Sequence, residues 1–305
     1  MTLDDLAPPR PGVPPRALLF GGSGQIGERV LHNLLRAGWQ VVATSRRPRA
    51  VVAGVEWRVA DLLQPWAAPE AFDAIVSCGP LDHFATWYQA SAVQAPRVVA
   101  FGSTSGQVKQ DSGDAAERDL SRRLREAEAT VLQAAAARNA AATVLRPTLV
   151  YGAGRDRTLT EMASLARRAG VFVLPRSACG LRQPVHVQDL ADAALAVLAA
   201  PATAGRSYDL GGGEILDYTA MVRRVLAALV PRPRLLRVPH AAFVLALALA
   251  HRAGRLRGMG SGALQRMAED LVFDLEPARR DFGYAPRAFV ITPAMVSAPA
   301  TTSAQ

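Results

Sequence analysis

The chain has 305 residues and half of them are apolar, which is enough to bury one large core or a nucleotide domain with a smaller second lobe. This composition excludes a disordered or fibrous protein. The formal net charge is +9, yet arginine supplies nearly all of the positive charge, Lys109 being the only lysine, and the arginines are scattered along the chain. Because no nucleic-acid-binding motif accompanies the charge, we expect no nucleic-acid partner.

The two ends of the chain differ from the rest in composition. Residues 1–15 hold five prolines and lack the apolar stretch of a signal peptide, and residues 293–305 are mostly Ala, Ser, Thr and Pro. We predict a disordered leader and a disordered tail there. The longest apolar run, Ala241 to Ala250, is about half of the ~20 residues that a membrane span needs, so it is interpreted as a buried helix or a wall of a substrate cleft. Cys78 and Cys179 lie in segments that look buried rather than cross-linked, which fits a cytoplasmic protein.

Strand and helix patterns alternate along the first half of the chain. An apolar run at Ala17 to Phe20 leads into a glycine-rich turn, and a helical pattern then continues to Gly38. Further strands are expected at 40–44, 55–59, 74–77, 97–101 and 142–145, and helices at 112–138, 159–169, 188–199 and 219–229. This order predicts an α/β protein with a Rossmann-type doubly wound parallel sheet and a smaller C-terminal substrate-binding lobe. Residues 16–150 would form the NADP-binding domain, and residues 151–292 would complete the sheet and form the lobe.

The glycine turn is the first candidate site. Small residues let the backbone approach a pyrophosphate, and the helix that follows directs its amide groups and the positive end of its dipole at the anion. A strand before the turn and a helix after it are the context that this fingerprint requires. The residues predicted to contact the cofactor here are Gly21, Ser23, Gly24, Gln25, Ile26 and Gly27.

The spacing of these glycines resembles that of the extended and atypical short-chain dehydrogenase/reductases, the superfamily of sugar-nucleotide epimerases and dehydratases. The resemblance runs from about Arg16 to about Arg287. Residues 72–79 are similar to the family's fourth strand and residues 98–105 to its fifth. Two later segments are more discriminating: residues 145–152, LRPTLVYG, match the LRPxxVYG strand end, and residues 182–191, RQPVHVQDLA, match the RxxxHVxDLA segment.

The coenzyme can be read where the second strand ends. NAD enzymes place an acid there, whose carboxylate would repel a 2′-phosphate. Counting from the glycines, this position is Ser45, followed by Arg46 and Arg47. A hydroxyl and two guanidinium groups suit a phosphate, so we predict NADP(H) in preference to NAD(H), with a solvated basic loop as the alternative. By resemblance, Asp61 and Leu62 would lie along the adenine, and Cys78 and Gly79 beneath the adenosine ribose.

Catalysis is where the resemblance breaks down. Family members use a Tyr-x-x-x-Lys pair in which the lysine lowers the pKa of the tyrosine, so that the tyrosine exchanges a proton with the substrate oxygen. None of the five tyrosines here has a lysine four residues later. Aligned on Glu128, which resembles the glutamate that closes the family's helix motif, the pair falls at Leu120 and Leu124. Two leucines cannot move a proton.

Other groups could contribute to catalysis or substrate binding. Thr104 is the best match for the family's hydroxyl partner, with Ser103 beside it; the alternative is a strand-end cluster that satisfies backbone groups. His83 and Tyr88 follow the fourth strand and are candidates for proton donation and substrate contact, although a lone loop histidine is more often merely exposed. Arg182 stands where nucleotide-sugar epimerases hold substrate phosphates, with a surface ion pair as the alternative.

Two residues of the later segment are predicted to be structural. His186, inside an apolar strand, would be a hydrogen-bonded core histidine, and Asp189 would cap or charge the start of its helix. We predict no metal site.

Taken together, these residues predict an atypical short-chain reductase that transfers hydride between NADP(H) and a carbonyl, enone or sugar-like substrate without the usual tyrosine–lysine pair. The alternative is a catalytically silent NADP(H)-binding sensor or accessory subunit. The expected partner is a small molecule, and the resemblance leaves a homodimer possible.

Overall fold

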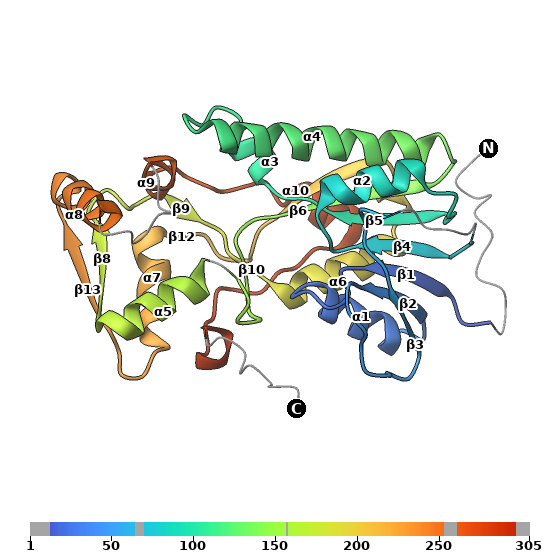
Figure 1. Ribbon diagram of the computed structural model, residues 1–305, viewed down its shortest axis with the longest axis horizontal. Helices are drawn as coiled ribbons and strands as arrows, with labels where there is room; N and C mark the ends of the chain where they lie inside the picture. Colours follow the sequence, from blue (N-terminus) through green and yellow to red (C-terminus); the bar gives the residue numbers. More distant parts are fainter. Residues whose placement is uncertain (1–12, 65–69, 157, 253–260, 297–305) are drawn as a thin grey trace.

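The computed structural model describes residues 13–64, 70–156, 158–252 and 261–296, and its centre is a seven-stranded parallel sheet (Figure 1). The strand order is β3-β2-β1-β4-β5-β6-β11. The order reverses between β1 and β4, which is the point where doubly wound sheets bind their ligands. The predicted Rossmann-type α/β fold is thus confirmed. The strands are β1 (Arg16–Phe20), β2 (Gln40–Ser45), β3 (Val55–Val59), β4 (Ala74–Ser77), β5 (Arg97–Phe101), β6 (Ala141–Pro147) and β11 (Arg206–Leu210).

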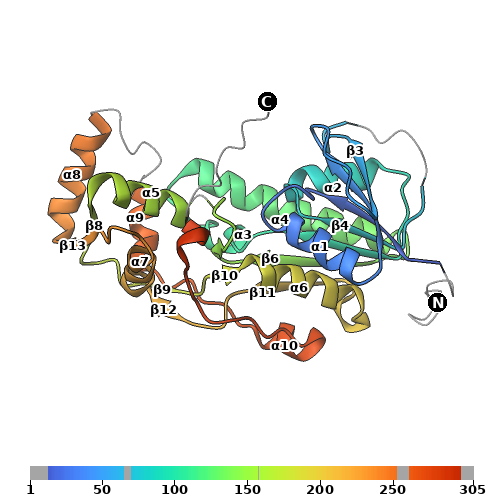
Figure 2. The same ribbon diagram turned by 90° about the horizontal axis from the view of Figure 1, so that it is seen from below.

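Helices cover both faces of this sheet, and each face has its own apolar cluster. On one face α1 packs beside α6, and on the other α2 packs along α4 (Figures 1 and 2). Near-continuous burial of β1, β4 and β5 follows from this, since helices exclude water from both sides of a parallel strand. The helices are α1 (Gly27–Arg36), α2 (Leu81–Ala90), α3 (Ser105–Val108), α4 (Ala115–Ala136), α6 (Val187–Leu198) and α10 (Glu276–Phe282), with a 3-10 turn η2 (Pro201–Thr203).

The second part of the molecule lies beyond the carboxyl ends of the strands and has a separate apolar core. Its strands pair only locally, β7 (Val150–Tyr151) with β10 (Val185–His186), β9 (Leu181–Arg182) with β12 (Leu216–Asp217), and β8 (Val171–Pro175) with β13 (Arg234–Val238). Its helices are α5 (Leu159–Ala169), α7 (Tyr218–Ala227), α8 (His240–Arg252), α9 (Ser261–Ala268) and the 3-10 helix η3 (Pro293–Val296). This is the smaller lobe that the sequence predicted.

Several expectations need correction. Residues 81–90 form helix α2 rather than a loop, because Leu81, Phe84 and Tyr88 recur at helical spacing and pack on the sheet. Residues 293–296, expected in the disordered tail, form η3, whose Val296 is buried in the lobe core. Residues 1–12 and 297–305 of the predicted leader and tail lie outside the described residues.

Two segments are less buried than the prediction of full burial requires. Helix α8 buries Phe243 and Leu247 but exposes Leu245 and Leu249, so only one face is covered, and Phe243 forms part of a cavity wall, which was the second expectation for this run. Cys179 is exposed, and Cys78 is partly buried. Among the helices that the structure describes, none is long and apolar enough to cross a membrane.

Candidate functional site

The glycine turn joins β1 to α1 and has the geometry of a phosphate cradle. Gly21 has a φ of +70°, a region that side chains rarely adopt, and a Cβ there would lie 2.8 Å from the Cys78 carbonyl carbon. A Cβ on Gly27 would overlap the Gly21 carbonyl oxygen, so glycine lets the helix approach the strand. The Gly24 N–H donates to the Gly21 carbonyl at 2.9 Å, and the next bond of the turn runs from the Glu28 N–H to the Gly24 carbonyl. The amides of Gln25 and Ile26, which lie between them, are left for a ligand.

Two buried polar atoms beside this turn lack a hydrogen-bond partner among the described residues. They are Oε1 of Gln25 in the turn and Oγ of Ser77 at the end of β4, the neighbour of β1. Unpartnered buried polar atoms are costly and call for an explanation. A dinucleotide laid across the carboxyl ends of β1 and β4 would bring polar groups to both atoms, so the residues present fit the cofactor.

The end of β2 carries the residues that the sequence assigned to coenzyme choice. Ser45 is buried, and its hydroxyl oxygen accepts hydrogen bonds from the Arg47 N–H and from Nε of Arg49, each at 3.3 Å. Arg46 and Arg47 are exposed. Arg49 thus joins the cluster as a third arginine that counting from the glycines did not include. The contact between Arg49 and Ser45 depends on how the chain turns after β2, so the sequence alone does not show it.

The predicted adenosine contacts lie on the next strand ends. The Asp61 carboxylate accepts a hydrogen bond from the Leu63 N–H, which fixes the loop after β3. A Cβ on Gly79 would lie 3.0 Å from Cδ1 of Leu62, so these two residues adjoin one another. Burial raises the pKa of the Cys78 thiol, which keeps this sulfur neutral beside the turn. These four residues and the glycine turn therefore all follow the carboxyl ends of strands of the sheet.

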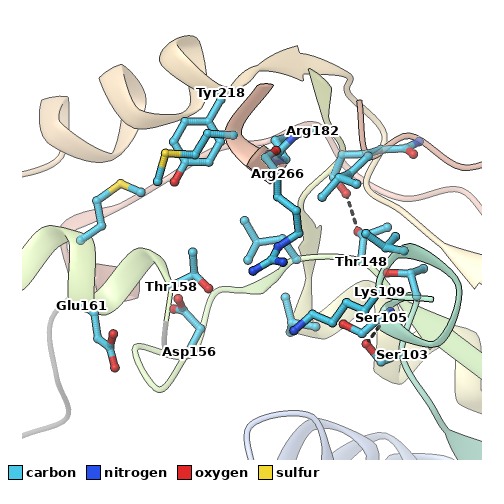
Figure 3. Close-up of a pocket in the computed structure, with 18 of the residues that line it drawn as sticks. Ser103, Ser105, Lys109, Thr148, Asp156, Thr158, Glu161, Arg182, Tyr218 and Arg266 are labelled. Carbon is cyan, nitrogen blue, oxygen red and sulfur yellow. Dashed lines mark hydrogen bonds between the residues drawn. The ribbon is translucent and has the colours of Figure 1, made fainter. Parts of the chain in front are cut away.

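A cavity of about 870 Å³ opens from this edge between the sheet and the lobe (Figure 3). Gln25 reaches it from the glycine turn, and Thr104 and Thr148 reach it from the ends of β5 and β6. The opposite walls come from the lobe and are largely apolar, with side chains from α5, β8, α8 and α9: Met162, Leu165, Phe172, Phe243 and Met267. One space therefore joins the cofactor turn, polar strand ends and an apolar wall.

Thr104 and Ser103 line this cavity, but their hydroxyl groups already have backbone partners. Thr104 is buried and donates its hydroxyl proton to the Pro147 carbonyl at 3.2 Å, and the Ser103 hydroxyl accepts from the Ser105 N–H at 3.1 Å. Lone pairs of Thr104 remain as acceptors. The Thr104 hydroxyl proton is engaged, so Thr104 by itself supplies no free proton to a substrate.

Helix α4 carries Leu120 and Leu124, the positions at which the sequence predicted the catalytic pair to be missing, and it supports its neighbour α3. The Ser121 hydroxyl donates to the Gly106 carbonyl at 2.7 Å, and Leu124 packs beside Gly106. Nε of Arg146 donates to the Glu128 carboxylate at 2.8 Å, so Glu128 of α4 is tied to the LRP strand. The alignment on Glu128 is consistent with this contact.

His83 and Tyr88 lie away from the cavity, which corrects their predicted roles. Both are on α2, and neither is among the residues that line the cavity. Tyr88 is buried against Phe84, at a centroid distance of 5.7 Å, and beneath the guanidinium of Arg138. Burial raises the pKa of the Tyr88 hydroxyl. It is therefore a core residue and not a substrate contact.

Arg182 is buried at the cavity wall, and its guanidinium holds the chain of the lobe together. Nη1 donates to the carbonyls of Leu181 and Glu269, each at 2.7 Å, and Nη2 donates to the Arg266 carbonyl. The guanidinium also lies 5.0 Å from the Tyr218 ring centroid. Burial lowers the pKa of Arg182, and the nearby charges of Asp270 and Glu269 offset this only in part. Among the described residues, no carboxylate is in ion-pair contact with this guanidinium. The surface ion pair considered as an alternative is therefore wrong.

The two residues predicted to be structural behave differently from one another. His186 is buried, and its Nδ1 accepts from the Gln188 N–H at 3.1 Å, so His186 itself caps α6. Asp189 lies in the first turn and instead accepts from the N–H and Nε of Arg287, at 3.1 and 2.7 Å. Asp189 therefore does not cap α6, because the His186 ring takes that place, but its carboxylate does lie in the first turn, as the alternative of charging the helix start expected.

A charged trio that the sequence did not single out stands on the polar side of the cavity. Lys109 and Arg266 point toward each other from opposite walls, and both bind the carboxylate of Glu117, Lys109 through Nζ at 3.2 Å (Figure 3). Burial raises the pKa of Glu117, but hydrogen bonds from Ser112, Arg266 and Lys109 outweigh it and leave the pKa below its ordinary value. The one feature of the sequence that could have pointed to this trio is that Lys109 is the only lysine of the chain.

Comparisons with known proteins agree with this geometry. A 2-alkyl-3-oxoalkanoate reductase of Stenotrophomonas maltophilia (strain K279a) is 27% identical across 89% of this chain and 95% of its own length. An epimerase from Methanothermobacter thermautotrophicus superposes with a TM-score of 0.65 at 15% identity, over 90% of this chain and 88% of that one. A UDP-glucuronic acid 4-epimerase of Bacillus cereus, in complex with NAD, gives 0.64 at 11% identity, over 93% and 96%. At such identities the structures show the fold alone.

The family model is more informative because it covers most of the chain. The model of the NAD dependent epimerase/dehydratase family matches residues 17–99 and 88–211, a region that includes the glycine turn, the β2 end and the LRP segment. This match confirms the predicted family and the expectation of an oxidoreductase or epimerase-like enzyme. The chain belongs to the NAD-dependent epimerase/dehydratase family.

Proposed function

We propose that the protein is an NADPH-dependent reductase of carbonyl compounds that carry an alkyl portion. The observation that carries this proposal is the cavity, which joins the cofactor turn to a wall of apolar side chains in the lobe. A sugar nucleotide needs many hydrogen-bonding partners for its hydroxyl groups, whereas methionine, leucine and phenylalanine side chains favour an alkyl chain. When bound, the cofactor supplies a hydride to the carbonyl carbon.

The preference for NADPH rests on the end of β2. Arg46, Arg47 and Arg49 surround the buried Ser45, and no acid stands at this position to bind the ribose hydroxyls of NAD. Guanidinium groups offer forked, charged donors to a phosphate. The three arginines therefore favour a cofactor with a 2′-phosphate.

The carbonyl substrate class is supported by the relative from Stenotrophomonas, which is named a 2-alkyl-3-oxoalkanoate reductase. Such a compound has two alkyl portions and a carboxylate. The apolar wall fits the alkyl portions, and Lys109, Arg182 and Arg266 supply positive charge for the carboxylate on the opposite side. Because Arg182 lacks a carboxylate partner among the described residues, a bound anion would offset the cost of its burial.

The test is a panel of substrates at saturating NADPH, followed by the loss of NADPH absorbance. The panel contains 2-alkyl-3-oxoalkanoates of increasing chain length, simple ketones, enones and UDP-sugars. We expect turnover of the oxoalkanoates, with a KM that falls as the alkyl chain grows. Turnover of UDP-sugars alone would contradict the proposal.

The panel also decides between a reductase and the silent sensor or accessory subunit. Leu120 and Leu124 favour the sensor, since the usual proton-transfer pair is missing. A sensor would bind NADPH in a fluorescence titration and turn over no member of the panel.

A further inference from the structure

Reduction of a carbonyl group requires a proton for the oxygen, and this chain lacks the family's usual donor. The following inference rests on the proposed reductase function. The Thr104 hydroxyl donates a hydrogen bond to the Pro147 carbonyl, and the α4 positions are leucines. The donor must therefore be another group that lines the cavity.

Most of the ionisable groups around the cavity are unsuited to this task. Asp156 is buried and accepts from the N–H groups of Leu159 and Thr160, so it caps the start of α5. Tyr218 begins α7 in the core of the lobe, with its ring against Arg182, and does not belong to the strand ends of the sheet. Guanidinium groups do not release a proton at any pH at which proteins fold. Glu161 is exposed on α5, away from the strand ends.

Lys109 is the remaining candidate, and its position is well fixed. It is the C-cap of α3, the short helix that begins directly after Thr104 at the end of β5. Ser121 and Leu124 of α4 hold α3 in place through Gly106. The family's lysine would come from α4 itself, whereas here α4 supports a helix that delivers a lysine to the same strand end.

The surroundings of Lys109 hold its ammonium group without using all of its protons. Nζ donates to the Glu117 carboxylate at 3.2 Å, and two N–H bonds remain. Its side chain is 21% exposed and reaches into the cavity (Figure 3). The charged groups that face it are Glu117 on α4, Arg266 on α9, and Asp156 across the cavity.

We propose that Lys109 is the catalytic residue that protonates the substrate oxygen during carbonyl reduction. As the carbonyl carbon gains hydride, the carbonyl π electrons move to the oxygen, the Lys109 N–H bond breaks and an O–H bond forms. Lys109 is left as a neutral amine and is reprotonated from water. Glu117 and Arg266 are positioning residues, since they fix Nζ and do not contact the reacting atoms.

A substrate-independent experiment follows from Lys109 being the single lysine. The full-length protein is treated with formaldehyde and cyanoborohydride, and dimethylation of Lys109 is compared by mass spectrometry with that of the N-terminal amine. We expect Lys109 to be modified in free protein and shielded several-fold by saturating NADP⁺, whereas the N-terminal amine is not shielded. Unchanged labelling of Lys109, in protein shown to bind NADP⁺, would overturn the proposal.

Variants test the proton transfer directly, with the best substrate from the panel. Lys109→Arg keeps the charge and the contact with Glu117 but cannot release a proton, so we expect kcat to fall at least ~100-fold while KM and the Kd of NADPH change by less than about threefold. Lys109→Met should lose as much. Arg122→Met is the matched control, since Arg122 is an exposed α4 arginine bound to Asp119 and Glu126, and it should keep wild-type kcat.

A chemical rescue completes the test. Alkylation of Lys109→Cys with bromoethylamine, in a Cys179→Ser background, restores a primary amine and should restore most of kcat. A Lys109→Arg protein with wild-type kcat would exclude this role and leave the reductase standing, whereas an inactive wild type would exclude the reductase itself.

Discussion

At the scale of single residues, Gly27 and the end of β2 carry the most direct consequences. The glycine pattern was readable because each glycine has a steric reason that holds in any Rossmann turn. Arg49 was not readable, since its contact with the Ser45 hydroxyl depends on how the chain turns after β2. The sequence shows that Lys109 is the only lysine, but not that it reaches the cavity, because its position depends on how α3 packs on α4.

Gly27→Ala tests the close approach of α1 to β1. The added Cβ would overlap the Gly21 carbonyl oxygen, and backbone atoms on both sides leave little room for adjustment. We expect the free energy of unfolding to fall by about 1–3 kcal/mol and NADPH binding to weaken more than tenfold. Thermal denaturation and a fluorescence titration measure the two effects. Gly38→Ala is the control, because no heavy atom lies within 4 Å of its Cβ position, so any loss there reflects its positive φ alone.

Ser45→Asp tests the coenzyme preference. A carboxylate at this buried position would repel the 2′-phosphate and accept hydrogen bonds from a ribose diol. We expect the Kd for NADPH to rise at least tenfold and the Kd for NADH to fall, as measured by titration of each cofactor. Equal weakening of both cofactors would contradict a 2′-phosphate site at Ser45 and Arg46.

At the scale of elements, the loop between β7 and α5 reaches back to the glycine turn. Arg155 binds the Glu28 carboxylate in a forked arrangement, at 2.9 to 3.0 Å, and donates to the Ser23 carbonyl at 3.1 Å. Arg155 also lines the cavity, so one side chain touches both the proposed cofactor turn and the substrate space.

Arg155→Ala should separate cofactor affinity from stability. The pair with Glu28 is largely exposed, so it contributes no more than about 1 kcal/mol to folding, and Tm should barely change. Removing a cation beside a bound pyrophosphate should nonetheless weaken NADPH about tenfold. Titration and thermal denaturation on the same sample check this, and a large loss of Tm with unchanged Kd would assign Arg155 a structural role instead.

Element boundaries show where sequence reasoning succeeded and where it failed. Six of the seven strands of the sheet were predicted to within two residues, because apolar runs bounded by turn residues have one interpretation. The edge strand β11 was not predicted, since Arg206, Ser207 and Asp209 interrupt its apolar residues. Helix α2 was not predicted, because its apolar pattern is short and begins only a few residues after β4, where a loop was expected. The apolar composition of α8 suggested that the whole helix is buried. One face is exposed because other elements pack only against the opposite face, and composition does not show this packing.

At the scale of the whole molecule, α10 is fastened to the edge strand of the sheet by one carboxylate. Asp281 accepts from Nε of Arg280, from the Tyr208 hydroxyl at 2.7 Å and from Arg206 at 2.9 Å. The hydrogen bonds from Arg280 and Tyr208 lower the pKa of Asp281 to about 2. The effect on the tyrosine is the opposite, since burial and Asp281 raise the pKa of Tyr208 to about 12.

This carboxylate should make stability depend on pH at the acid end. Because its pKa is lower in the folded than in the unfolded chain, Asp281 stabilises the fold fully above about pH 4 and loses this contribution as the pH falls toward 2. Tyr208→Phe removes one donor and so diminishes the shift. We expect the variant to be less stable than wild type at about pH 6 and the gap to narrow near pH 2, as measured by urea unfolding at each pH. A gap that is constant with pH would mean that only packing was lost.

The strand at the edge of the sheet has a further consequence for how the protein unfolds. β11 pairs with β6, although the chain has passed through the lobe between them, and α10 returns from the lobe to cover β11. Neither the sheet domain nor the lobe is therefore formed by one continuous segment of the chain that could be removed by truncation. A fragment ending at residue 150 would lose β11 and α6 together and leave β6 with a bare edge, which invites association with other chains. The sheet and the lobe should therefore melt in a single cooperative transition.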